Sequence, residues 1–104
     1  MQNKLKQSET RIVKRSEITP SDYNPRTISE EARKALKKNI KDNGIIGGMV
    51  FNEGTGNLVS GHQKLNIADE VNKYDPNTGK NDYEIKVEVI NVDLKKEKEL
   101  NIFF

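Results

Sequence analysis

Residues 83–89 alternate between apolar or aromatic and charged side chains, in the order YEIKVEV. Successive side chains of a β-strand point to opposite faces, so this alternation predicts a strand with one buried and one solvated face. Such a strand is not stable alone and needs neighbouring strands and a covering layer. A chain of 104 residues has room for one domain of this kind.

The rest of the sheet is predicted from shorter segments. Residues 11–15 favour an edge strand, and residues 45–52 and 57–60 favour a hairpin around a turn at 53–56. Residues 1–10 are polar and predict a flexible arm, and residues 16–26, with Pro20 and Pro25, predict a loop.

Three helices complete the predicted order of strand, helix, hairpin, helix, strand, helix. Ser29 is expected to cap the first helix, which Asn43-Gly44 ends, and Asp93 to cap the last. The second helix is expected over residues 61–73. The apolar positions are Ala32, Ala35, Leu36 and Ile40 in the first helix, and Leu65, Ile67, Ala68 and Val71 in the second. The fold class predicted is α+β, a small mixed β-sheet with three or more helices.

Composition excludes several kinds of site. The chain has no cysteine, which excludes disulfides, thiolate metal sites and a cysteine nucleophile, and its one histidine is His62. Asp22 and the pairs Glu30-Glu31 and Asp69-Glu70 could offer carboxylates to Mg²⁺. The members of each pair are helical neighbours that do not share a face, so a solvated face is favoured and no metal site is predicted. Apolar runs are too short for a transmembrane helix or a signal peptide, so we expect a cytoplasmic protein without a membrane partner.

Charge is unevenly distributed along the chain. Residues 1–41 carry eleven Lys and Arg against five Asp and Glu, whereas residues 42–104 carry seven against eleven. A basic face of this kind could contact DNA phosphates, and a solvated helix and arm is the alternative. The candidate DNA contacts are Arg11, Lys14, Arg15, Lys37 and Lys38.

The segment 57–68, NLVSGHQKLNIA, places a short strand directly before a helix. The first backbone N–H groups of a helix lack internal partners and lie at the positive end of its dipole, which favours anions. Gly61 would allow a ligand to approach the backbone, while His62, Gln63 and Lys64 would supply donors. The alternative is an ordinary junction in which Ser60 caps the helix.

This segment resembles the ParB/sulfiredoxin superfamily. Gly61-His62-Gln63-Lys64 is similar to the GHQR-type motif of ParB-like "nuclease" domains found in phages and with orphan DNA methyltransferases. Residues 18–26 resemble the family's first box, which ends in Asn-Pro-Arg, and residues 36–46 resemble its helix ending. Residues 85–102 resemble the end of the domain in the methyltransferase-associated branch. The resemblance covers residues 11–104, which we expect to be one domain at the N-terminal part of a longer protein.

The resemblance implies a phosphate-binding helix start that faces the Asn-Pro-Arg loop. Relatives bind CTP, in the partition proteins, or ATP, in sulfiredoxins and a serine kinase, so a nucleoside triphosphate with Mg²⁺ is the implied ligand. The implied phosphate-binding residues are Arg26, Ser60, Gly61, His62, Gln63 and Lys64. His62 replaces the sulfiredoxin cysteine, which excludes that thiol chemistry.

Three functions remain open at this point. The first is a DNA-associated module with a nucleotide pocket. The second is an enzyme of the same fold, a metal-dependent nuclease or a phosphoryl transferase, in which His62 is the acid or base. The third is an interaction domain, in which Phe103 and Phe104 contact a second copy or a following domain unless they fold back into the core.

Overall fold

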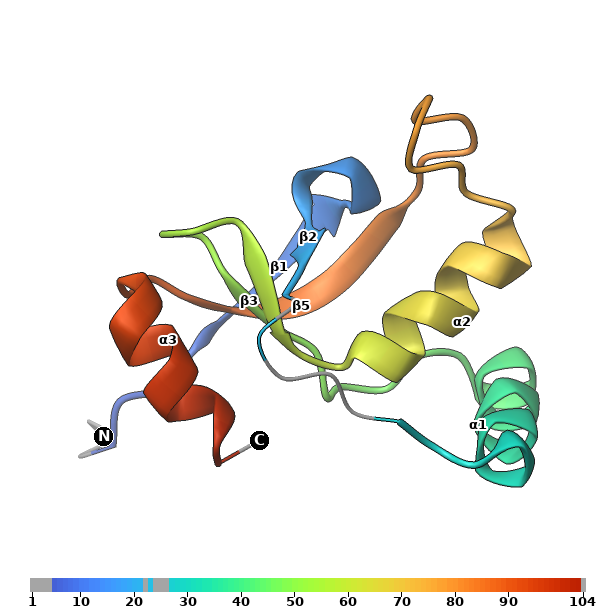
Figure 1. Ribbon diagram of the computed structural model, residues 1–104, viewed down its shortest axis with the longest axis horizontal. Helices are drawn as coiled ribbons and strands as arrows, with labels where there is room; N and C mark the ends of the chain where they lie inside the picture. Colours follow the sequence, from blue (N-terminus) through green and yellow to red (C-terminus); the bar gives the residue numbers. More distant parts are fainter. Residues whose placement is uncertain (1–4, 22, 24–26, 104) are drawn as a thin grey trace.

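A mixed five-stranded sheet with three helices forms the protein in the computed structural model, which describes residues 5–21, 23 and 27–103 (Figure 1). The α+β prediction is confirmed. The elements in chain order are β1 (Glu9–Lys14), the 3₁₀ turn η1 (Arg15–Glu17), β2 (Thr19–Pro20), α1 (Glu30–Asn43), β3 (Val50–Asn52), β4 (Asn57–Ser60), α2 (His62–Asn72), β5 (Glu84–Ile90) and α3 (Leu94–Asn101).

The strands are ordered β1-β5-β3-β4-β2 across the sheet. β5 lies near the centre, antiparallel to β1 with Val87 opposite Arg11, and parallel to β3 with Val89 opposite Phe51. β4 is antiparallel to β3 and parallel to β2. β1 is therefore an edge strand, as its sequence predicts.

The hydrophobic core lies between the sheet and α2. Its buried members are Val13, Ile18, Met49, Phe51, Leu58, Leu65, Ala68, Ile85, Val87 and Val89. The apolar face of β5 contributes three of these side chains, which confirms the predicted alternation. Val71, expected on the buried side of α2, is instead 47% exposed.

The helices differ in how they are held. α1, which is described throughout, contains no buried residue: Leu36 and Ile40 are half-buried, and Ala32 and Ala35 are exposed. It lies beside α2, whereas α3 packs against β4 at the other end of the molecule (Figure 1). Phe103, just after α3, is 82% exposed and is not part of the core, and Phe104 lies outside the described residues.

Three predicted boundaries are corrected by the structure. β1 begins at Glu9 and not at Arg11, so two residues assigned to the arm belong to the sheet. The predicted loop contains the short strand β2, where Pro20 is tolerated because β2 is an edge strand. The strand expected from Ile45 begins only at Val50, because Gly47 and Gly48 have φ angles of +63° and +76° that a strand does not adopt.

Candidate phosphate-binding pocket

The start of α2 is shaped by the left-handed backbone of Gly61, with φ 96° and ψ 22°. A Cβ atom at this position would lie 2.8 Å from the Gly48 carbonyl oxygen and 2.8 Å from the Met49 Cγ, so a side chain cannot be accommodated without movement of the backbone. Gly61 is the N-cap residue, and within the described part of the chain no side chain caps the helix. The alternative in which Ser60 caps α2 is therefore wrong.

A pocket of about 330 Å³ opens at this helix start, and we call it the α2 pocket. Five of the six predicted phosphate-binding residues, Ser60 to Lys64, line it. The sixth, Arg26, lies outside the described residues, although the next residue, Thr27, lines the pocket. The other lining residues come from five different helices, strands or loops: Ile28, Leu36, Gly48, Val59 and Asn101.

Lys64 brings a positive charge to the wall of the α2 pocket. Its ammonium group donates a hydrogen bond of 3.1 Å to the Gly47 carbonyl oxygen, across the loop that precedes β3. The side chain is thus held against that loop, beside the first turn of α2. A cation at this position adds to the positive end of the helix dipole.

His62 is oriented by Ser21, the residue that follows β2. The Ser21 backbone N–H donates to His62 Nε2 over 3.3 Å, and the Ser21 hydroxyl lies 2.9 Å from the same nitrogen. Because a backbone N–H can only donate, Nε2 accepts, and the proton of the neutral ring is assigned to Nδ1. Sequence reasoning missed Ser21, since its position depends on β2, which was not predicted.

The last residue of α3 closes part of the α2 pocket. Asn101 is 5% exposed, and its side-chain amide donates a 2.7 Å hydrogen bond to the Val59 carbonyl oxygen. Residues 59 and 101 are adjacent in space because α3 returns across β4. The only sequence signal for Asn101 was its place in the segment resembling the end of the ParB-like domain.

A buried carboxylate holds α3 in this position. Glu97 is fully buried, and its oxygens accept hydrogen bonds from the side chains of Asn52, Thr55 and Asn57. Burial alone would raise the pKa of Glu97, but these hydrogen bonds outweigh it and lower the pKa. Burial and the nearby Glu97 carboxylate raise the pKa of Tyr23 to about 12.

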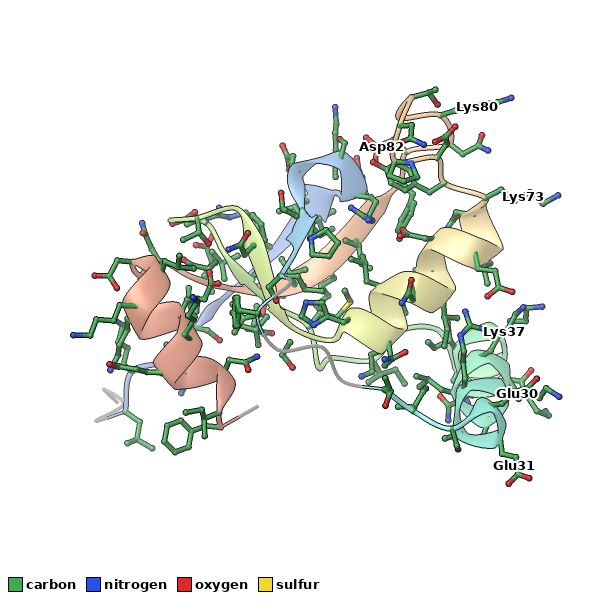
Figure 2. All side chains as sticks on the ribbon, viewed as in Figure 1. Glu30, Glu31, Lys37, Lys73, Lys80 and Asp82 are labelled. Atoms are coloured by element: carbon green, nitrogen blue, oxygen red, sulfur yellow. The ribbon has the colours of Figure 1, made fainter. Side chains whose placement is uncertain are left out.

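The predicted DNA-contacting cations lie on three separate elements, β1, η1 and α1, and most face a carboxylate. On β1, Arg11 pairs with Glu9 and Glu53, while Lys14 is exposed. On α1, the ammonium group of Lys37, which is labelled in Figure 2, lies 2.6 Å from a Glu70 oxygen. That of Lys38 lies 2.7 Å from an Asp42 oxygen.

Arg15 differs from the other predicted DNA contacts because its side chain is buried. It is 6% exposed and donates to both oxygens of Asp69, over 2.8 and 3.1 Å. Its guanidinium lies 4.7 Å from the centre of the Tyr74 ring, and the Tyr83 hydroxyl donates to Asp69 as well. This cluster joins η1 to the second half of α2, so the charge of Arg15 is used inside the protein.

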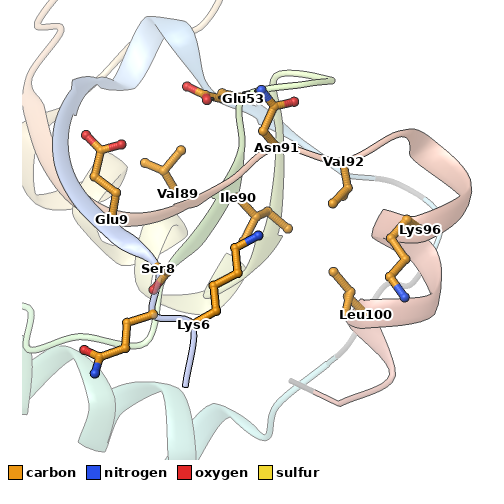
Figure 3. A pocket seen from close by; sticks show the side chains of 11 residues that line it. Lys6, Ser8, Glu9, Glu53, Val89, Ile90, Asn91, Val92, Lys96 and Leu100 are labelled. Atoms are coloured by element: carbon orange, nitrogen blue, oxygen red, sulfur yellow. Dashed lines mark hydrogen bonds between the residues drawn. The ribbon is translucent and has the colours of Figure 1, made fainter. Parts of the chain in front are cut away.

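A larger pocket of about 520 Å³ lies between residues 6–9, the end of β5 and α3, and we call it the α3 pocket (Figure 3). Lys6 and Leu100 are among its lining residues. Two of its carboxylates, Glu9 and Glu53, already pair with Arg11. The lining of the α3 pocket includes Val92 and Lys96, which flank the start of α3, but the Asp93 side chain caps that helix start, unlike the start of α2 at which an anion site is predicted.

The described residues contain no group of three or more His, Asp or Glu side chains arranged to hold a metal ion. None of the helices in the described part of the chain has the length and apolar character needed to cross a bilayer.

Comparison with solved structures gives a match over most of the chain. The crystal structure of the C-terminally truncated chromosome-partitioning protein ParB from Caulobacter crescentus, in complex with CTP-γ-S, superposes with a TM-score of 0.65. The fold is ParB-like. Sequence identity is 17%, and the match covers 91% of this chain and 51% of that one, so this chain spans about half the length of that protein.

Sequence comparisons add no closer assignment, since no protein-family model and no curated protein sequence matches the chain. At 17% identity, the structural likeness shows the fold alone. Membership of the methyltransferase-associated branch stays a prediction from the residues of the motif.

Proposed function

We propose that the α2 pocket binds the phosphate groups of a nucleoside triphosphate, in a module that associates with DNA. The observation that carries this proposal is the combination, in one pocket, of the ammonium group of Lys64 and a helix start whose N-cap is Gly61 and for which the described residues show no side-chain cap. Support also comes from the similar ParB structure, which was solved with CTP-γ-S.

Each residue has a distinct role in this proposal. The backbone around Gly61 and His62 supplies oriented donors to phosphate oxygens, and Lys64 neutralises their charge. Arg26 is the second cation, carried over from the resemblance. Mg²⁺ would bind mainly through the phosphates and water, as it does in many nucleotide sites. A volume of about 330 Å³ is at the lower end of the range for small-molecule sites.

Calorimetric titration with CTP, ATP, GTP and UTP, each with Mg²⁺, tests the proposal. We expect micromolar binding of one nucleotide, weakened at least tenfold by Lys64→Ala, a loss of about 1.4 kcal/mol. Lys80→Ala is the matched control, because Lys80 projects from the loop before β5, far from the start of α2 (Figure 2). Absence of binding to all four nucleotides, or equal loss in the two variants, would overturn the proposal.

The DNA contact is proposed for Lys14, Lys37 and Lys38, with Arg11 as a further candidate. We leave out Arg15 because it is buried against Asp69. Binding that rests on phosphate contacts weakens steeply with salt. The combined Lys37→Ala and Lys38→Ala variant should therefore bind a fluorescent duplex more weakly and with a shallower salt dependence. An unchanged salt slope would exclude α1 from the contact.

An enzyme is the second candidate, because the Ser21 hydroxyl lies 2.9 Å from His62 Nε2. Contact between a hydroxyl and a histidine nitrogen is the arrangement in which a base activates an oxygen nucleophile. Nuclease or nucleotide hydrolysis that persists through purification and disappears in His62→Ala would favour the enzyme. Nucleotide binding without turnover would favour the binding module.

A further inference from the structure

The loop before β3 touches the first turn of α2 at two glycines. A side chain on Gly61 would meet the Gly48 carbonyl oxygen at 2.8 Å, as described above. A Cβ atom on Gly48 would in turn overlap the ammonium nitrogen of Lys64 and lie 3.5 Å from its Cε. The space beside Gly48 is therefore the space that the Lys64 ammonium group occupies.

Gly47, the residue before Gly48, holds the Lys64 ammonium group through a hydrogen bond. The Gly47 carbonyl oxygen accepts its 3.1 Å hydrogen bond, so the nitrogen lies over the Gly47–Gly48 backbone. Both Gly48 and Lys64 line the α2 pocket. Position 48 thus decides whether this cation can stay in the pocket wall.

We propose that Gly48 is a positioning residue of the anion site, whose lack of a side chain holds the Lys64 ammonium group beside the start of α2. This inference rests on the proposed phosphate-binding function. It identifies position 48 as a determinant of affinity for polyphosphate anions, through Lys64 and not through direct contact. A methyl group at 48 pushes the ammonium group out of its place.

The displacement has a small effect on the fold. The atom that a methyl group at 48 would meet is the far end of a flexible side chain, which can rotate away. The φ of Gly48 is +76°, so alanine also carries the usual strain of a left-handed backbone. A control variant with a similar backbone strain is therefore needed to isolate the displacement of the Lys64 ammonium group.

Gly47 is the matched control. Its φ of +63° imposes a similar strain on alanine, but a Cβ atom there meets no group of the described residues within 4 Å. Thermal unfolding should therefore show similar losses of stability for Gly48→Ala and Gly47→Ala. The two variants should differ at the Lys64 side chain: the ¹H–¹³C resonance of its ε-methylene should shift in Gly48→Ala and stay in Gly47→Ala.

Calorimetric titration with inorganic triphosphate, which has no base or sugar, measures the consequence. We expect Gly48→Ala to bind at least fivefold more weakly than Gly47→Ala, and expect no further loss when Gly48→Ala is added to Lys64→Ala. Equal affinities of the two glycine variants, with binding retained in the wild type, would overturn this inference alone. A wild-type protein that binds neither triphosphate nor any nucleotide would overturn the proposed function and this inference together.

Discussion

The starts of α2 and α3 differ in the groups that lie beside the unpaired backbone N–H groups of their first turns. At α3, the Asp93 carboxylate accepts a 2.8 Å hydrogen bond from the Lys96 backbone N–H, and Glu97 adds a buried carboxylate in the first turn. At α2, the N-cap is a left-handed glycine, and within the described residues no side chain caps the helix. The start of α3 thus has acidic residues of its own at the cap and in the first turn, and the first turn of α2 has none.

The difference concerns where negative charge can be added. α1 follows the pattern of α3, since the Ser29 hydroxyl accepts from the Ala32 N–H and Glu30 and Glu31 lie in the first turn. The first turn of α2 contains no acidic residue and includes Lys64. This difference in charge is the reason that we propose an anion site at α2 and not at α1 or α3.

The largest effect is expected at the glycine on which the α2 start depends. Gly61→Ala adds a left-handed alanine and a contact of 2.8 Å with the Gly48 backbone, so we expect a loss of about 3 kcal/mol in the free energy of unfolding. Gly56→Ala is the control, because φ there is +81° but, in the part of the chain that the structure describes, no atom lies within 4 Å of the added Cβ. Urea unfolding should give a loss of only about 1 to 2 kcal/mol for the control. Equal losses of stability in the two variants would mean that the loop before β3 does not lie close enough to Gly61 to exclude a methyl group.

A smaller loss is expected at Glu97, the buried carboxylate in the first turn of α3. In Glu97→Gln, an amide N–H₂ would face one of the donors Asn52, Thr55 or Asn57, at a cost of about 2 kcal/mol. Glu99→Gln, on the exposed side of the same helix, should change stability little.

The same carboxylate predicts a pH dependence. The pKa of Glu97 is lowered in the folded state from an ordinary value of 4.5, so the unfolded chain binds the proton more tightly. The stabilisation is therefore complete above pH 4.5 and is lost as the pH falls through the lower pKa of the folded protein. Wild-type stability should fall more steeply with acid below this pH than that of Glu97→Gln. Parallel curves would show that the carboxylate is not ionised in its buried network.

The smallest expected change in stability gives the sharpest test of the comparison. Gln63→Glu places a carboxylate in the first turn of α2, as α1 and α3 already have. It should leave the fold intact, with a change below about 1 kcal/mol, but weaken triphosphate binding about tenfold by occupying the positive helix end. Asn66→Glu adds the same charge one turn later on an exposed position and should weaken binding much less. Similar weakening in both variants would indicate a general charge effect and not the helix start.

Much of the fold follows from local patterns. The period-two alternation before Val89 predicted β5, and the caps Ser29 and Asp93 were predicted from residue type and position. These features depend on interactions between residues close in sequence, so they can be recognised without knowledge of how the chain packs. β2 was not predicted. Its two residues, Thr19 and Pro20, are too few to show an alternation of apolar and polar side chains, and they form a strand only by pairing with β4.

Part of the α2 pocket was also predicted from residues that are close in sequence. The five residues from Ser60 to Lys64 were placed together because they are consecutive around one helix start. Gly48, Ser21 and Asn101 come from three other parts of the chain, and their nearness to the α2 start is a result of packing. In the sequence, Gly47 and Gly48 look like ordinary turn residues.

The sequence by itself determined the kinds of element, their order and the strand–glycine–helix junction, since these rest on periodicity and backbone preference. Tertiary structure alone decided which charged side chains lie at the surface, where a ligand or DNA could reach them. Arg15 and Lys37 both belong to the basic first part of the chain, yet packing buries Arg15 against Asp69 and leaves Lys37 beside Glu70 at the surface. It also brought Lys64 to the Gly47–Gly48 backbone. The physical reason is that burial and electrostatic pairing depend on distances between residues far apart in sequence, which only the packed chain defines.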